Sequence, residues 1–276
     1  MEQHGENPRQ NVIAVIPARY ASTRLEGKLL LPLGGKPLIL HTLEQANRAE
    51  TVSRVIVATD DERILRVVHD SGNEAVFTSP EHRSGSDRIA EVALSLPDRS
   101  IIVNVQGDEP LISPRTIDAA VECLLEHDAA DMSTTCEVVK NHEDVLNPNV
   151  VKVVIDGHGY AVYFSRSSIP FPRDAVSKYG SIEAALNAEP ELVSRFRKHT
   201  GLYVYRRNFL LRFAKMEQTA LEKTEMLEQL RVIENAGRIV VAEIEGGSVG
   251  VDTREDFERV RTILAAQNPK SGIQNS

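Results

Sequence analysis

Residues 12–28 read VIAVIPARYASTRLEGK, an apolar run that stops at Pro17 and passes directly into a polar loop. Two further apolar runs lie at 55–57 and 101–105, and each is soon followed by polar residues or glycine. Continuous rather than alternating apolar runs are typical of strands that are buried on both faces, as in a parallel sheet. The three runs therefore predict strands of one buried, parallel sheet.

Helical patterns separate these runs. One helix is predicted after Pro37, which suits a first helical position, and a second after a cap at Asp60 or Asp61. Apolar residues at helical spacing predict two more helices over 89–96 and 117–125. Strands that alternate with helices form right-handed βαβ units. We therefore predict an α/β fold with a doubly wound, mostly parallel sheet.

The pattern changes after about residue 141. Short strands are predicted at 151–155, 160–165 and 201–205, with a hairpin turn at 156–159. These strands predict a smaller, more antiparallel region inserted in the main sheet. The other expectations are a loop or mobile segment over 172–191, a helix over 226–235 that Gly237 ends, a strand over 239–244 and a last helix from a Thr253 cap to Ala266. One folded domain is expected over 11–266, with polar tails at 1–10 and 267–276.

Charge and composition exclude several classes of protein. Lys plus Arg number 32 and Asp plus Glu 40, which gives a net charge of −8. An acidic chain lacks long-range attraction to phosphate backbones and anionic membranes, so we expect no nucleic acid and no membrane partner. Cys123 and Cys136 form no CxxC motif, which argues against a disulfide scaffold and fits a reducing compartment. The polar start does not resemble a signal peptide, and we expect a cytoplasmic protein.

The loop after the first run concentrates cationic groups. Residues 17–28 contain Arg19, Arg24 and Lys28, together with hydroxyl groups and a glycine. Ligands of open α/β sheets bind beyond the carboxyl ends of the strands, where this loop is expected. Charge-assisted donors at that place suit a polyphosphate, although the loop matches neither GxxxxGK[ST] nor GxGxxG. The alternative is a solvated basic loop.

An acidic pair, Asp108 and Glu109, follows the third apolar run. Carboxylates there would provide the hard oxygen ligands that Mg²⁺ prefers, and Gly107 would let the backbone approach a ligand closely. Asp252, just before the last helix, is a second candidate ligand. The alternative for both aspartates is helix capping, although Ser113 is better placed to cap the helix that follows Asp108.

Two polar clusters lie in the second region. Alternation over 199–205 puts His199 and Tyr203 on one face of a strand, and a helical pattern puts Glu225 and Gln229 on one side of a helix. Ordinary packing of the strand residues and a solvated helix face are the alternatives.

Taken together, these motifs resemble one family, the 3-deoxy-manno-octulosonate (Kdo) cytidylyltransferases or CMP-Kdo synthetases. The matching segments run in order over nearly the whole chain and include PARYASTR at 17–24, SGSDRIAEV at 84–92, VNVQGDEP at 103–110, NPNVVKVV at 147–154, YAVYFSRSSIPF at 160–171 and GVDTREDFERV at 250–260. The resemblance implies a Rossmann-like nucleotidyltransferase that joins Kdo to CMP from CTP and releases pyrophosphate. It also implies Mg²⁺ as cofactor, a role in lipopolysaccharide biosynthesis and a homodimer.

The resemblance further implies site residues for the nucleotide and the metal. CTP would be bound by Ala18, Arg19, Ser22, Arg24, Lys28, Arg88 and Gln106. Mg²⁺ would be bound by Asp108 and Asp252, and the catalytic residues would be these two aspartates with Arg19 and Lys28. The nucleotide-binding part would span about 11–140 and 238–266.

A second set of residues is implied for the sugar acid. Kdo would be bound by Arg166, His199, Tyr203, Glu225 and Gln229, in a part that spans about 141–237 and also carries the dimer interface. Arg166 suits the Kdo carboxylate because a planar guanidinium can bind a carboxylate through two parallel hydrogen bonds.

The sequence departs from the family pattern at Glu26, where the family has proline. The change adds a negative charge near the phosphates, so the placement of Lys28 stays open. Two other functions also stay open: a cytidylyltransferase for another sugar acid, such as sialic acid or amino-Kdo, and a nucleotide-binding regulatory protein. The presence of Arg19, Lys28, Asp108 and Asp252 argues against the regulatory protein.

Overall fold

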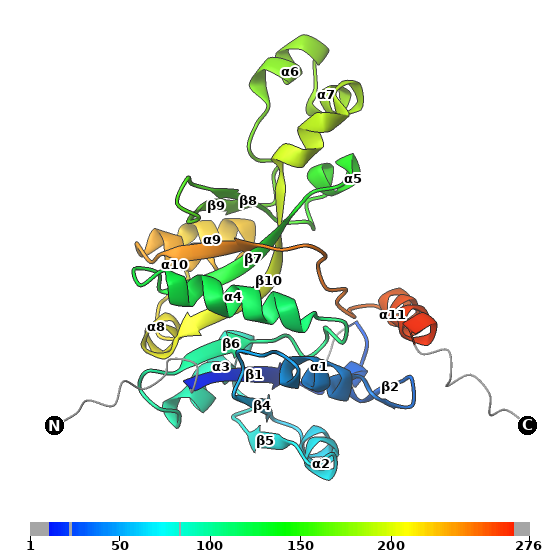
Figure 1. Ribbon diagram of the computed structural model, residues 1–276, viewed down its shortest axis with the longest axis vertical. Helices are drawn as coiled ribbons and strands as arrows, with labels where there is room; N and C mark the ends of the chain where they lie inside the picture. The colour runs from blue at the N-terminus through cyan, green and yellow to red at the C-terminus, as the bar shows by residue number, and fades with distance from the viewer. Residues whose placement is uncertain (1–10, 22–23, 83, 268–276) are drawn as a thin grey trace, which may run out of the picture. The chain divides into compact units, whose positions relative to one another are not determined.

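A computed structural model of the chain describes residues 11–21, 24–82 and 84–267 (Figure 1). The chain divides into two compact units. Unit 1 takes in Met1–Asp118, Tyr205–Ala214 and Ser248–Ser276, and unit 2 takes in Ala119–Val204 and Lys215–Gly247. These bounds differ from the division near residues 140 and 238 that the sequence suggested. The assignment of nucleotide and sugar binding to separate parts remains a prediction.

Unit 1 is built on a parallel sheet. Strand β1 (Val12–Ala18) lies between β6 (Ile101–Asn104) and β4 (Arg54–Thr59), and β5 (Glu74–Phe77) pairs with β4. All of β1 except Pro17 is buried, as the continuous apolar run predicted. Strand β5 was not predicted; it has four residues and begins with a glutamate.

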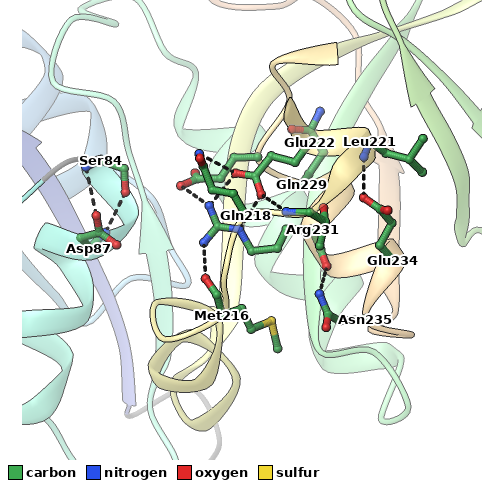
Figure 2. A network of polar contacts seen from close by, with 12 residues as sticks. Ser84, Asp87, Met216, Gln218, Leu221, Glu222, Gln229, Arg231, Glu234 and Asn235 are labelled. Atoms are coloured by element: carbon green, nitrogen blue, oxygen red, sulfur yellow. Dashed lines mark hydrogen bonds and ion pairs between the residues drawn. The ribbon is translucent and has the colours of Figure 1, made fainter. Parts of the chain in front are cut away.

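The helices of unit 1 begin at caps that the sequence largely indicated. They are α1 (Leu38–Asn47), α2 (Glu62–Asp70), α3 (Gly85–Leu94), α8 (Arg207–Phe213) and α11 (Arg254–Gln267), while α4 (Pro114–Glu126) runs from unit 1 into unit 2. Asp61 caps α2, and Ser84 caps α3 through a reciprocal pair of hydrogen bonds with Asp87 (Figure 2). Pro37 lies at the cap of α1 rather than at its first helical position. The short elements η2 (Lys28–Leu30), β2 (Pro32–Leu33) and β3 (Lys36–Pro37) connect β1 to α1.

Unit 2 contains both parallel and antiparallel strand pairs. The predicted hairpin is confirmed as β8 (Lys152–Ile155) and β9 (Ala161–Ser165), whose turn is held by the Asp156 carboxylate. Strand β10 (Arg197–Arg206) pairs antiparallel with β8. By contrast, β7 (Met132–Val138) and β11 (Ile239–Glu243) pair in parallel. The region is therefore mixed rather than purely antiparallel.

The expectation of a loop or mobile segment over 172–191 was wrong. This stretch forms α6 (Arg173–Tyr179) and α7 (Ile182–Ala188), followed by η3 (Pro190–Arg195), while α5 (His142–Leu146) precedes it in the chain. Gly180 ends α6 with φ 87°, and Ser181 caps α7. Short helices with charged outer faces have a sequence pattern that resembles a loop, but here they bury a shared apolar cluster. Its members are Val139, Val145, Ala175, Ala185, Leu186, Leu192, Val193 and Phe196.

The single helix expected over 226–235 was also wrong. Helix α9 (Ala220–Glu225) ends at Met226, whose φ of 53° is left-handed, and α10 (Leu230–Glu234) starts after Gln229. Glu225 and Gln229 therefore do not share one helix. The chain leaves α10 through Ala236, with φ 57°, one residue before the glycine that was expected to end the helix.

A buried ion pair holds the corner between α9 and α10 (Figure 2). The Arg231 guanidinium donates to both carboxylate oxygens of Glu222, from Nε at 2.7 Å and from Nη2 at 2.5 Å. Arg231 also donates to the Met216 carbonyl, and the Leu221 amide donates to the Glu234 carboxylate. These contacts fix the two helices to one another at the left-handed turn. None of the described helices is long and apolar enough to cross a membrane.

We expect Glu222→Gln to lower the free energy of unfolding by about 3 kcal/mol, because it leaves the buried Arg231 without its carboxylate. Denaturant unfolding of the full chain measures this change. Glu217→Gln, an exposed carboxylate just before α9, is the matched control and should change stability by less than about 0.5 kcal/mol. Equal losses in the two variants would contradict the role given to the pair.

Candidate functional site

A pocket of about 350 Å³ opens in unit 1 beyond the carboxyl ends of β1 and β6. Three segments line it: the loop after β1, the start of α3 and the loop after β6. The lining residues are Pro17, Arg19, Ala21, Lys28, Leu29, Ser84, Gly85, Gln106, Gly107 and Asp108. Its place in the sheet is the one where open α/β folds bind ligands.

Lys28 joins the basic loop to the acidic residues. Its Nζ donates to Asp108 Oδ2 at 2.5 Å, to Asp252 Oδ1 at 2.9 Å and to the Val251 carbonyl at 2.9 Å. Burial lowers the pKa of Lys28, but the carboxylates of Asp108 and Asp252 raise it by more, so its pKa lies above the ordinary value. A charged ammonium therefore lies between two aspartates that are far apart in the sequence.

Neither aspartate caps a helix. Thr253 caps α11, because its hydroxyl accepts from the Asp256 amide while the Asp256 carboxylate accepts from Thr253. Asp252 instead uses its side chain for Lys28 and for Arg24, whose Nη1 lies 3.2 Å from Asp252 Oδ2. Asp108 lies in the loop after β6, well before α4 begins at Pro114. The capping alternative for the two aspartates is therefore wrong.

The two carboxylates form a donor set that fits a hard divalent cation. Mg²⁺ is usually bound by one or two protein carboxylates, with phosphate oxygens and water as its other ligands. Asp108 and Asp252 provide two carboxylates beside a pocket of the size of a small ligand, and Lys28 neutralises only part of their charge.

Arg19 and Gln106 both line the pocket, and their contact with a nucleotide remains a prediction. Arg19 Nη2 donates to the His82 carbonyl, and Gln106 Nε2 donates to Asn104 Oδ1 at 3.2 Å. Ala18 is buried at the end of β1, between two of the lining residues. Ser22 lies outside the described residues.

Arg88 occupies a different position from the one expected. It is fully buried in α3 and does not line the pocket. Its Nη2 lies 2.5 Å from Asp60 Oδ2 and its Nη1 lies 2.5 Å from Thr78 Oγ1. It thus ties α3 to the residues that follow β4 and β5, and a direct contact with the nucleotide remains a prediction.

Glu26 does not displace Lys28 from the pocket. The Glu26 side chain is exposed, while Gly27 adopts a left-handed φ of 63° in a turn closed by the Lys28 amide and the Leu25 carbonyl. The backbone of Gly27 also packs against the Tyr20 ring, which leaves no room for a Cβ atom. The turn directs Lys28 inward and Glu26 outward.

Glu109 differs from its neighbour Asp108 more than the sequence indicated. Burial raises the pKa of Glu109 to about 8, and the charge of Asp108 adds to the rise. Glu109 is therefore mostly protonated at neutral pH, and the expected acidic pair carries less charge than two free carboxylates.

The five residues predicted for the sugar acid all lie in unit 2. Arg166 meets Glu225: the Arg166 amide donates to Glu225 Oε2 at 3.0 Å, and Arg166 Nε donates to the Glu225 carbonyl at 2.7 Å. Ser165 Oγ donates to the other carboxylate oxygen of Glu225 at 2.6 Å. The left-handed turn at Met226 makes these contacts compatible with the end of α9.

The other three form a second contact group. Tyr203 donates to Gln229 Oε1 at 3.0 Å, and its ring lies 5.3 Å from that of His199. Gln229 is only 4% exposed, yet among the described residues its Nε2 has no hydrogen-bond partner. A buried donor without a partner is rare in folded proteins, so this position calls for an explanation.

Burial lowers the pKa of His199 to about 4, so its imidazole is neutral near pH 7. The Thr134 hydroxyl gives its proton to the Leu202 carbonyl, 2.7 Å away. The 2.8 Å hydrogen bond between Thr134 and His199 Nε2 therefore has the imidazole as donor. This tautomer leaves Nδ1 as an acceptor. Thr134, on β7, gave no signal in the sequence.

Comparisons with known proteins identify the family of the chain. Residues 13–239 match the family described as cytidylyltransferase. Proteins named 3-deoxy-manno-octulosonate cytidylyltransferase from Trichlorobacter lovleyi and Geotalea uraniireducens are each 53% identical, over 91% and 90% of this chain and 97% of their own length.

A solved structure of a CMP:2-keto-3-deoxy-manno-octonic acid synthetase in complex with CTP is 37% identical. It covers 93% of this chain and 99% of its own, with a TM-score of 0.83. A 4-diphosphocytidyl-2C-methyl-D-erythritol synthase from Anaerococcus prevotii, at 15% identity and a TM-score of 0.59, shares the fold alone.

The structural likeness confirms the predicted Rossmann-like α/β class, and the sequence likeness extends over nearly the whole chain. The chain belongs to the cytidylyltransferase family and, within it, to the 3-deoxy-manno-octulosonate cytidylyltransferases.

Proposed function

We propose that this chain joins Kdo to CMP from CTP with release of pyrophosphate, as a step of lipopolysaccharide biosynthesis. The observation that carries the proposal is the contact of Lys28 with both Asp108 and Asp252 at the wall of the unit 1 pocket. It joins a phosphate-binding cation to a metal-binding pair of carboxylates, and phosphoryl transfer to a sugar hydroxyl needs both.

In this proposal the unit 1 pocket binds CTP. Arg19, Arg24 and Lys28 supply charge-assisted donors to the triphosphate. The first residues of α3 line the pocket, and the N-terminus of a helix favours an anion. Asp108 and Asp252 would hold Mg²⁺, which when bound would neutralise phosphate charge and polarise a phosphoryl oxygen.

The anomeric hydroxyl oxygen of Kdo attacks the α-phosphorus of CTP and gives up its proton to solvent, while the bond from that phosphorus to the bridging oxygen breaks and its electron pair leaves with pyrophosphate. Negative charge develops on the pyrophosphate oxygens, where the Lys28 ammonium and the Arg19 guanidinium stabilise it. Because little covalent chemistry falls to the protein, positioning of the two substrates supplies much of the rate.

Unit 2 supplies the sugar-acid side. Arg166 donates to the carbonyl oxygens of Glu225, Pro148 and Met226, which leaves one further N–H group on each of Nη1 and Nη2, and we propose that these two bind the Kdo carboxylate. The buried Gln229 Nε2 would donate to a sugar hydroxyl oxygen, and the neutral imidazole of His199 would accept from a hydroxyl. Donors and acceptors of this kind distinguish one sugar acid from another.

We further propose a homodimer that works in the cytoplasm. Phe171 and Met226 of unit 2 expose 62% and 76% of their surface, and large exposed apolar side chains are common at interfaces between subunits. The free thiols of Cys123 and Cys136 suit a reducing compartment. Light scattering of the purified protein over a range of concentrations tests the dimer.

The activity is tested by pyrophosphate release with each of the four nucleoside triphosphates and with Kdo, sialic acid or amino-Kdo. We expect release only with CTP, Kdo and Mg²⁺ together. Turnover of a different acid instead of Kdo would show that Kdo is not the substrate. Binding of CTP without turnover of any acid would favour the regulatory protein.

We expect Asp108→Asn and Asp252→Asn to lower kcat about a hundredfold or more, equivalent to about 2.7 kcal/mol of transition-state stabilisation. Asparagine lacks the charge that a hard cation needs, which is why kcat should fall. It keeps an acceptor for Lys28, so Tm should stay within about 2 °C. Asp70→Asn, on the exposed end of α2, is the control and should leave kcat unchanged. Near-normal turnover of either variant at saturating Mg²⁺ would remove that aspartate from the metal site.

We expect Arg166→Lys to raise KM for Kdo about tenfold while KM for CTP stays nearly constant, because a lysine cannot form the paired hydrogen bonds of a guanidinium. Steady-state kinetics with each substrate varied in turn measure the split. Arg173→Lys, the same change on the exposed face of α6, should alter neither constant. Equal weakening for both substrates would place Arg166 outside the sugar pocket.

A further inference from the structure

Lys152, the first residue of β8, is a lysine with no exposed surface. Its Nζ donates to three backbone carbonyls: Asn147 at 2.9 Å, Val150 at 2.5 Å and Arg166 at 2.9 Å. Among the described residues, no carboxylate forms an ion pair with it. Lysines are almost never fully buried unless they are paired, so this side chain calls for a specific explanation.

The three carbonyls match the three N–H bonds of an ammonium group. They satisfy its donors without neutralising its charge. Burial lowers the pKa of Lys152, the charge of Arg166 lowers it further, and Asp144 and Glu225 act in the opposite direction. Asp144 is itself engaged with Lys198 at 3.3 Å. Lys152 and Arg166 thus place two positive charges near the carboxylates of Asp144 and Glu225, and Lys198 also binds Asp144.

Lys152 holds Arg166 at two places. It binds the backbone carbonyl of Arg166 directly. It also binds the carbonyls of Asn147 and Val150, which flank Pro148, and the Pro148 carbonyl accepts from Arg166 Nη1 at 3.0 Å. One ammonium group therefore fixes both the backbone of Arg166 and the turn on which its guanidinium rests.

We propose that Lys152 is a positioning residue for the sugar acid. It orients the Arg166 guanidinium toward the ligand carboxylate, and its charge, which is in direct contact only with carbonyl oxygens, adds to the attraction for that anion. The proposal rests on the proposed function, in which Arg166 binds the carboxylate of Kdo. A purely structural lysine would affect stability, and would affect the two substrates equally.

The test is Lys152→Met in the full chain, which keeps the length of the side chain and removes its charge and donors. We expect KM for Kdo to rise about tenfold or more, because Arg166 is no longer held in place and its charge-assisted hydrogen bonds to the Kdo carboxylate weaken. KM for CTP should change less than about twofold. Wild-type protein that does not use Kdo would overturn the proposed function itself. Wild-type turnover of Kdo, with a variant that changes both KM values equally or only Tm, would overturn the role of Lys152 alone.

Arg207→Met is the matched control. Arg207 is another buried cation that donates to backbone carbonyls, those of Ala93 and Leu94, but it also pairs with Asp98 and lies in unit 1. Its loss should lower Tm and leave KM for Kdo unchanged. A rise in KM for Kdo in this variant too would show that general destabilisation is the cause, and the proposal would fail.

A second measurement reads the charge itself. The methyl ester of Kdo lacks the carboxylate, and wild-type protein should bind it much more weakly than Kdo in competition. Lys152→Met should make the affinities for Kdo and for its methyl ester more alike. An unchanged ratio of the two affinities would contradict the electrostatic part of the proposal. If Lys152→Met does not fold, Lys152→Gln, which keeps two donors, takes its place at low temperature. If neither folds, Lys152 is a folding residue and the positioning role is withdrawn.

Discussion

The pairing of β1 with both β4 and β6 decides where this chain can bind a ligand. Parallel strands end at a common edge, so the loop that leaves β1 and the loop that leaves β6 are brought side by side. Gly107 makes the approach close, since a Cβ atom there would lie 3.0 Å from the Pro17 carbonyl and 3.2 Å from Ile39. The pocket, its basic loop and Asp108 follow from this one arrangement of strands, whereas Asp252 comes from the segment before α11.

Local charge at the pocket works against the net charge of the chain. The protein carries −8 overall, so an anionic nucleotide gains no long-range attraction and depends on short-range donors. We propose Lys28 as one such donor, and in this structure it is engaged with Asp108 and Asp252. A divalent cation at the aspartates would release it toward a phosphate. In the proposed reaction, the cation would then take the place of Lys28 at the aspartates, and a phosphate would take the place of the aspartates at Lys28.

Sequence could predict the parts of the fold and of the site that depend on local pattern. The continuous apolar runs predicted β1, β4 and β6, and Thr253 and Asp61 predicted their helix starts. Prediction from sequence failed where contacts between residues far apart in the chain determine the structure. Helices α6 and α7 are an example, because their apolar residues are buried in a cluster shared with α5 and η3. It also failed at Met226, because a left-handed methionine has no sequence signal and breaks a helical pattern that is otherwise regular. The burial of Glu109, which raises its pKa, depends on tertiary neighbours and could not be read from its proximity to Asp108.

The two lysines that matter most for the proposed chemistry are held in opposite ways. Lys28 is bound by carboxylates, which neutralise it and which ligands can replace. Lys152 is bound only by backbone carbonyls, which cannot be removed without unfolding β8 and its turn, and which leave its charge in place. A buried charge without a counter-ion is costly, and an anionic ligand that enters beside it recovers part of that cost. An exchangeable cation suits a triphosphate whose charge is redistributed during the reaction, whereas a fixed cation suits a carboxylate that only has to be held.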